Sequence, residues 1–138
     1  MAQSPTGRGV AQVVEAVVTL PATNTGTVDA ITVPAGTVVI GAGLEILGAP
    51  GDVDTYTVDL QLETDTTVIA NDLDLDAATA NTKFYGADGT SVTAAEDVLQ
   101  VVATVTGSPA AVEARVFAIV ADVNDMGQAD EVDRDQLA

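Results

Sequence analysis

The chain has 138 residues, of which 47% are hydrophobic, and its 21 acidic and four basic residues give a formal net charge of −17. Without cysteine or histidine it can form no disulfide, no thiolate nucleophile, no imidazole base and no zinc site with nitrogen or sulfur ligands. Such an acidic surface repels phosphates, which excludes direct binding to nucleic acid. The length and apolar content predict one domain with a core of its own.

The first residues, MAQSPTGRGVAQ, contain no basic segment followed by an apolar one, so no secretion signal is expected. No uninterrupted apolar run reaches the roughly 18 to 20 residues that a membrane helix requires, so no membrane contact is expected either. Residues 1–9 have little capacity to fold alone and are predicted to form a flexible N-terminal arm. The arm carries Arg8, which we expect to meet an acidic neighbouring subunit or the protein's partner.

Three segments, residues 12–20, 55–63 and 98–105, alternate apolar and polar side chains with the period of a half-buried β-strand. Clusters of turn-forming residues separate the apolar runs. Strands at this spacing predict an all-β antiparallel sandwich or barrel over residues 10–124. The turn clusters are residues 21–26, 34–36, 48–52, 86–90 and 106–110. The core-facing positions predicted by the alternation are Val14, Ala16, Val18, Leu20, Tyr56, Val58, Leu60, Leu62, Leu99, Val101, Ala103 and Val105.

The stretch TVVIGAGLEILGAPG, residues 37–51, begins like a dinucleotide-binding site. Such a site needs a third glycine where this chain has Ile46, and a helix of roughly three turns where only about one turn fits before residue 48. As a strand, the segment instead leaves Gly41 and Gly43 bare on one face. Such glycines predict a bulge or bend, or the close approach of another backbone or a large side chain. The opposite, apolar face would be formed by Val38, Ile40, Ala42, Leu44 and Ile46.

The densest acidic motif is NDLDLD, residues 71–76, in which Asp72, Asp74 and Asp76 would share one strand face at a repeat of about 6.6 Å. Three carboxylates in this arrangement are candidate ligands of a hard cation such as calcium. The alternative is a solvated strand face, which we favour because positions six and twelve of a calcium-binding helix-loop-helix motif would here be Ala77 and Lys83 rather than glycine and glutamate. No other cofactor is expected.

Catalysis is not expected from this chain. Pairs of carboxylates cleave glycosidic bonds in some enzymes, but the sugar then needs aromatic platforms, and the chain has only two tyrosines and two phenylalanines. Serine nucleophiles lack a base, since histidine is missing and Lys83 lies far from any nucleophile motif. The sequence therefore predicts a protein that is not an enzyme.

Residues 113–123 are apolar on both strand faces over the second half of the segment. Such a strand is either central in the pair of sheets or covered by another chain, and both alternatives remain open. A mean hydropathy of +0.32 in so charged a chain also indicates apolar area for burial against other subunits. Residues 125–138 are acidic, contain little apolar material, and are predicted to form a mobile C-terminal tail. The two strand faces are Val116, Ala118 and Val120 on one side and Phe117, Ile119 and Ala121 on the other.

Three segments together resemble small virion proteins of tailed bacteriophages, especially marine ones: ITVPAGTVVIGAGLEIL (31–47), YTVDLQLETDTTVIANDLDLDAA (56–78) and EDVLQVVATVTGSPAAVEARVFAIVADV (96–123). The resemblance covers most of the chain from Ile31 to Val123 and consists of fold-like patterns. The turn at 63–67 departs from it by lacking the glycines often found there. The resemblance implies a jelly-roll or related sandwich and a structural role on a phage head or tail.

By this resemblance the function is that of a capsid decoration, or cement, protein on the outer surface of the virion. It would bind the major capsid protein as a homo-oligomer, for which a trimer is favoured over a dimer because it suits the local three-fold positions of a capsid. Contacts with other subunits or the capsid are expected at Arg8, Gly41, Gly43, Phe117 and Ile119. The alternatives are a tail or fibre component with a receptor- or glycan-binding role and a calcium-dependent adhesive module.

Overall fold

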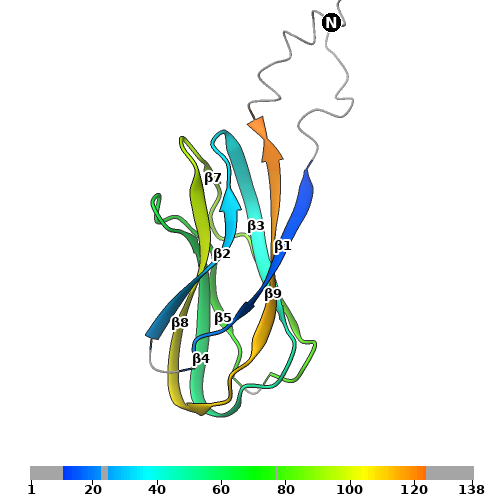
Figure 1. Ribbon diagram of the computed structural model, residues 1–138, viewed down its shortest axis with the longest axis vertical. Coiled ribbons are helices and arrows are strands. Elements are labelled where there is room, and N and C mark those ends of the chain that lie inside the picture. The colour runs from blue at the N-terminus through cyan, green and yellow to red at the C-terminus, as the bar shows by residue number, and fades with distance from the viewer. Residues whose placement is uncertain (1–10, 23–24, 77, 124–138) are drawn as a thin grey trace, which may run out of the picture.

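The computed structural model describes residues 11–22, 25–76 and 78–123, and their strands form two antiparallel sheets packed face to face (Figure 1). The first sheet has the strand order β1-β9-β3-β6, with β7 also paired to β3, and the second has the order β2-β8-β4-β5. The predicted arm, residues 1–9, and tail, residues 125–138, lie outside the described residues. The strands are β1 (Gln12–Thr19), β2 (Thr25–Val33), β3 (Thr37–Ile46), β4 (Gly51–Leu62), β5 (Val68–Asp74), β6 (Lys83–Gly86), β7 (Ser91–Val92), β8 (Asp97–Pro109) and β9 (Glu113–Asp122).

The chain changes sheet at nearly every connection. Only β4 and β5, and β6 and β7, follow one another within one sheet. Apart from the two-residue strand β7, each sheet has four strands, and two four-strand sheets connected in this way form a jelly roll, in which strands distant in sequence pair side by side. The predicted all-β, antiparallel, jelly-roll-like sandwich is confirmed. Among the described residues, no helix has the length and apolar character needed to cross a membrane.

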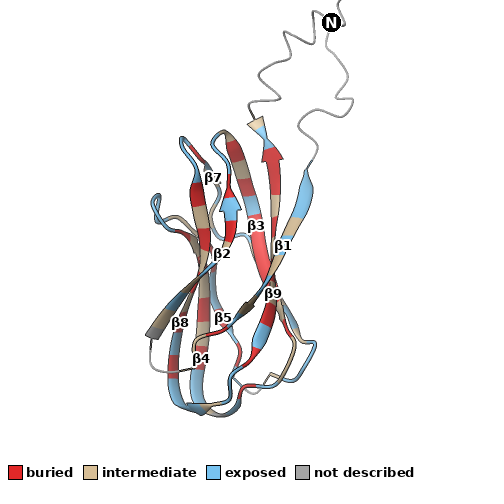
Figure 2. Ribbon diagram, viewed as in Figure 1, coloured by how far each residue is buried: buried red, intermediate tan, exposed pale blue. Residues whose placement is uncertain are grey.

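The core lies between the two sheets, and buried positions alternate with half-buried or exposed ones along β4, β8 and β9 (Figure 2). The alternation predicted for residues 55–63 and 98–105 is confirmed, since every core-facing position named there is at most 2% exposed. In β1 the predicted face is correct, but Val14, Ala16 and Val18 are only half-buried because this strand lies at the edge of its sheet.

Tyr56 is among the largest fully buried side chains of this core. Its hydroxyl donates a hydrogen bond to the backbone carbonyl of Pro21, which satisfies the single polar group of the ring. Burial raises the pKa of Tyr56 to about 12. The bond also ties the segment between β1 and β2 to the centre of the second sheet.

In the first half of β3, the residues that face the core are not the ones predicted. Val39 is fully buried and Ile40 is 37% exposed, so the prediction that Val38 and Ile40 face the core is wrong. The cause is a shift in the pairing with β9 between Val39 and Gly41, which inserts one residue and reverses the alternation. The bulge that the glycines predicted as one alternative is therefore present, and Ala42, Leu44 and Ile46 face the core as expected.

Four of the predicted turn clusters, 21–26, 48–52, 86–90 and 106–110, share residues with strands. β4 begins at Gly51 and β8 continues to Pro109, and these two residues pair with each other. Gly51 and Gly107 have positive φ angles of 83° and 102°, which glycine adopts without steric cost. The glycines that suggested turns thus allow irregular strand ends to remain paired.

Candidate functional site

The outer face of the first sheet, which points away from the core, is the most distinctive surface among the described residues. The strand register sets side chains of β1, β9, β3 and β6 beside one another in rows. One row contains Glu15, Phe117, Gly43 and Tyr85. We call this surface, which comprises the outward-facing side chains of these strands and Val92 of β7, the aromatic face.

Two aromatic rings cover the glycines of β3. Tyr85 and Phe117 stack with their centroids 6.3 Å apart and their planes 5° from parallel. A Cβ atom on Gly43 would lie 2.1 Å from the backbone oxygen of Phe84 and 2.6 Å from Cζ of Phe117. A Cβ atom on Gly41 would lie 2.2 Å from the hydroxyl oxygen of Tyr85. The glycines are therefore needed because large side chains of the same molecule approach them closely.

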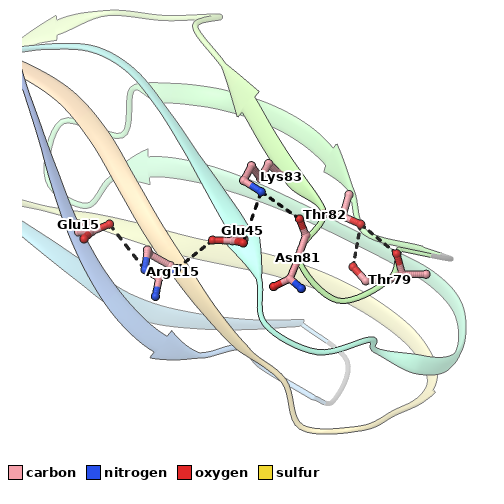
Figure 3. A network of polar contacts seen from close by, with 7 residues as sticks. All are labelled: Glu15, Glu45, Thr79, Asn81, Thr82, Lys83 and Arg115. Carbon is pink, nitrogen blue, oxygen red and sulfur yellow. Dashed lines mark hydrogen bonds and ion pairs between the residues drawn. The ribbon is translucent and has the colours of Figure 1, made fainter.

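A network of four charged side chains crosses the same face (Figure 3). Nη1 of Arg115 donates a hydrogen bond of 2.9 Å to Oε1 of Glu45, and its Nε lies 3.7 Å from Oε1 of Glu15. Nζ of Lys83 lies 3.5 Å from Oε2 of Glu45. The side chain of Glu45, at 18% exposed, is the least accessible of the four, and both described basic residues neutralise it.

Among the described residues, the exposed large hydrophobic side chains all belong to strands of the first sheet: Val13, Val17, Ile40, Tyr85 and Val92. Val13 is 63% exposed and pairs with Ile119, while Val17 is 52% exposed and pairs with Arg115. Their outward position on an edge strand extends the apolar area beyond the two rings. A surface that combines exposed apolar side chains with a few paired charged groups is typical of a site that contacts another protein.

By contrast, the outer face of the second sheet is polar. Its register brings threonine, glutamine and aspartate side chains together, as in the row Asp29, Gln100 and Gln61. Nε2 of Gln100 donates a hydrogen bond of 2.8 Å to Oδ1 of Asp29. The acidic residues of this face are not matched by any basic residue described in the second sheet.

The three aspartates considered for calcium lie at the end of β5 and just beyond it. Asp72, Asp74 and Asp76 are exposed, and Leu73 and Leu75 between them are buried, so the predicted separation of faces is present. Oδ1 of Asp74 accepts a hydrogen bond of 3.0 Å from the backbone nitrogen of Asp76. No three acidic groups within residues 11–22, 25–76 and 78–123 are grouped so that they could hold a metal ion. Calcium binding here stays a prediction, without a described cluster to support it.

Asp97, which is 6% exposed, lines a pocket of about 310 Å³ with Thr64, Asp65, residues 92–95 and Glu96. Its carboxylate accepts hydrogen bonds from the backbone nitrogens of Thr64, Val98 and Asp65 at 2.9, 2.8 and 3.1 Å. Burial raises the pKa of Asp97, but these three bonds outweigh it and hold the pKa below its usual value. A carboxylate committed to three backbone groups stabilises the loop at residues 63–66 rather than acting on a ligand.

Of the predicted contact residues, Phe117 and Ile119 lie half-buried on the aromatic face. Gly41 and Gly43 are buried beneath the rings, so they offer no surface of their own, and Arg8 lies outside the described residues. The strand from residue 113 is central in its sheet, between β1 and β3, as one of the two alternatives predicted. Coverage of β9 by another chain also remains open, because the outward-facing side chains of this strand are only half-buried.

Sequence reasoning missed the charged network and the role of Tyr85. The sequence did contain one signal of an exposed apolar surface: in β1, Val13 and Val17 occupy the face opposite the core-facing residues.

No protein-family model and no curated protein sequence matches the chain. Solved structures do match it in fold. A chain in the acidic stable capsid structure of Helicobacter pylori bacteriophage KHP30 is 22% identical with a TM-score of 0.55, over 80% of this chain and 92% of that chain. A chain of the cyanophage Pam1 capsid asymmetric unit is 16% identical with a TM-score of 0.61, over 87% and 90%. A chain from the capsid of Ralstonia phage GP4 is 19% identical with a TM-score of 0.50, over 88% and 90%.

Proposed function

We propose that the protein is a structural component of a bacteriophage virion and that it decorates the outside of the capsid. The observation that carries this proposal is the match in fold, over nearly the full length of both chains, to proteins in three phage capsids. Because the matched chains are covered to 90% or more, the likeness concerns whole small proteins rather than one domain of a large shell protein.

The charge of the protein supports an outer position. A net charge of −17 opposes contact with packaged DNA, whose phosphates bind proteins mainly through lysine and arginine. The polar outer face of the second sheet suits exposure to solvent. The aromatic face suits burial against a protein, either a capsid subunit or a second copy of this chain. We propose the major capsid protein as the partner and a homo-oligomer as the bound form, with a trimer matching the three-fold positions of the lattice.

A structural role also fits the chemistry of the described residues. The most enclosed carboxylate, Asp97, is bound by backbone groups, and the four charged groups of the network pair with one another on the aromatic face. We therefore propose that the protein acts by binding and not by catalysis.

The test compares phage particles that contain the protein with particles from which its gene has been deleted. Cryo-electron microscopy should show the sandwich on the outer surface of the head in the first sample and bare lattice in the second. The deleted particles should lose their DNA at lower temperature or milder osmotic shock, and adding back purified protein should restore resistance. Density on the tail instead of the head would contradict the decoration role and favour the tail or fibre alternative.

A further inference from the structure

The distribution of exposed apolar side chains indicates which surface of a second copy of this chain could bind the aromatic face. All large exposed hydrophobic side chains of the described residues lie on the first sheet. When two copies of this chain meet and both bury apolar area, both must therefore use this sheet. Contact through the same patch on both subunits is isologous and generates a two-fold axis.

The charged network has a matching pattern. In the order of the strands, β1 carries Glu15, β9 carries Arg115, β3 carries Glu45 and β6 carries Lys83, so the sign alternates negative, positive, negative, positive (Figure 3). A second copy turned by a two-fold axis parallel to the strands presents this order reversed. Arg115 then lies opposite Glu45 of the second copy, and Val17 lies opposite its Lys83, with Glu15 two residues further along β1.

The same orientation limits repulsion between two strongly acidic molecules. The four network residues sum to zero charge, whereas the chain as a whole carries −17. Complementary charges across such a contact contribute orientation and choice of partner more than affinity. Most of the binding free energy would come from the rings and valines between them.

We propose that the aromatic face binds the aromatic face of a second copy across a two-fold axis, with β1 of one copy over β6 of the other. The sheets would pack about 10 Å apart, as in the interior of a β-sandwich. This deepens the homo-oligomer of the proposed function, and it also limits its size. A closed assembly with a two-fold contact has an even number of copies: two, or six when trimers pair.

The first experiment measures the mass of the purified full chain by analytical ultracentrifugation between about 1 µM and 1 mM, without capsid. We expect an even number of copies. Val13→Asp places a charge on the aromatic face at a side chain that is 63% exposed, so the monomer should fold, and the dissociation constant should rise at least about tenfold. Thr27→Asp is the matched control, because Thr27 is exposed on β2, the corresponding edge strand of the second sheet. It should leave the mass unchanged.

The second experiment tests whether β1 of one copy lies over β6 of the other. Because the chain has no native cysteine, an introduced cysteine is its only thiol. A mixture of Val17→Cys and Lys83→Cys chains should be joined by a short bismaleimide reagent, whereas each variant alone should be joined poorly.

An odd number of copies, one or three, would overturn the two-fold contact, as would equal effects of Val13→Asp and Thr27→Asp or cross-linking of like positions. None of these results would affect the capsid role, which is tested on particles. Failure of particle binding by a protein with an even number of copies would overturn the capsid role alone.

Discussion

The two outer faces of the sandwich are built from the same kind of strand but differ in chemistry. The first sheet presents stacked rings, exposed valines and a neutral network of four charges, while the second presents threonine, glutamine and aspartate. Both sheets bury their inner faces equally well, so core formation does not explain the difference. The contrast shows that a strongly acidic chain can carry a network of zero net charge and exposed apolar side chains on one outer face, which keeps that face suitable for contact with another protein.

The largest expected effect is a difference in stability between alanine substitutions at the two glycines beneath the rings. Gly43→Ala should destabilise the fold by about 3 kcal/mol, since the new methyl group meets the backbone oxygen of Phe84, which cannot move alone. Gly41→Ala should cost about 1 kcal/mol, since its nearest neighbour is the flexible end of Tyr85. Urea denaturation measures both, with Gly48→Ala as control because nothing lies within 4 Å of its Cβ position. Equal losses at Gly41 and Gly43 would contradict the packing described.

A second effect distinguishes two carboxylates of the second sheet. Asp97→Asn removes the negative charge and replaces Oδ2, the acceptor for Asp65, by a donor, leaving one oxygen for Thr64 and Val98, and it should cost about 2 kcal/mol at pH 7. Asp74→Asn, at an exposed position, keeps an acceptor for Asp76 and should be close to neutral.

The loss at Asp97 should depend on pH. Its pKa is lower in the folded protein than in the unfolded chain, so its contribution is complete above the unfolded value of about 3.9 and is lost as the pH falls through the folded value. Unfolding free energies of the wild type and Asp97→Asn, measured from pH 7 to pH 2, should therefore converge in acid. A difference that stays constant over this range would show that the carboxylate is not the stabilising group.

A smaller effect compares the polar interactions of the two outer faces by their contribution to stability. Arg115→Met keeps the aliphatic stem but leaves Glu15 without its described partner and Glu45 with Lys83 alone, and it should cost about 1 kcal/mol. Gln100→Leu removes the hydrogen bond to Asp29 on the second sheet and should change stability by less than about 0.5 kcal/mol. The loss at Arg115 should shrink in 1 M NaCl, and a salt-independent loss would argue against an ionic origin.

The smallest expected difference is between calcium and magnesium. Raising the ionic strength should stabilise this acidic protein by about 1 to 3 kcal/mol in total, through screening of repulsion. At equal ionic strength the two cations should act alike, because the described aspartates of residues 71–76 do not gather around one point. Thermal melts in each salt provide the measurement. A gain specific to calcium that Asp74→Asn abolishes would revive the metal-site hypothesis.

Sequence periodicity was sufficient for the sandwich because Tyr56, Val58, Leu60 and Leu62 alternate without interruption. It failed at Ile40 because one inserted residue reverses the phase of every residue before it, and no local pattern marks the insertion. It also failed at Gly51 and Pro109, where turn-forming residues remain in a paired strand.

The aromatic face was harder to predict than the fold. Phe117 and Ile119 could be selected because both faces of their strand are apolar. The stacking partner Tyr85 and the network around Glu45 depend on register between strands that are some 40 to 70 residues apart in the chain. No spacing within a single segment encodes such pairings.

The position of the last two strands has a consequence for how the chain acquires its fold. β8 lies between β2 and β4, and β9 lies between β1 and β3, so the middle of each sheet is synthesised after its neighbours. Until residues 97–122 have left the ribosome, the earlier strands cannot complete either sheet. Folding is therefore expected to follow synthesis and to be slow, on the scale of milliseconds to seconds, because nearly every pairing must first close a long loop. During that interval the strong negative charge of the chain keeps unpaired strands of separate molecules apart.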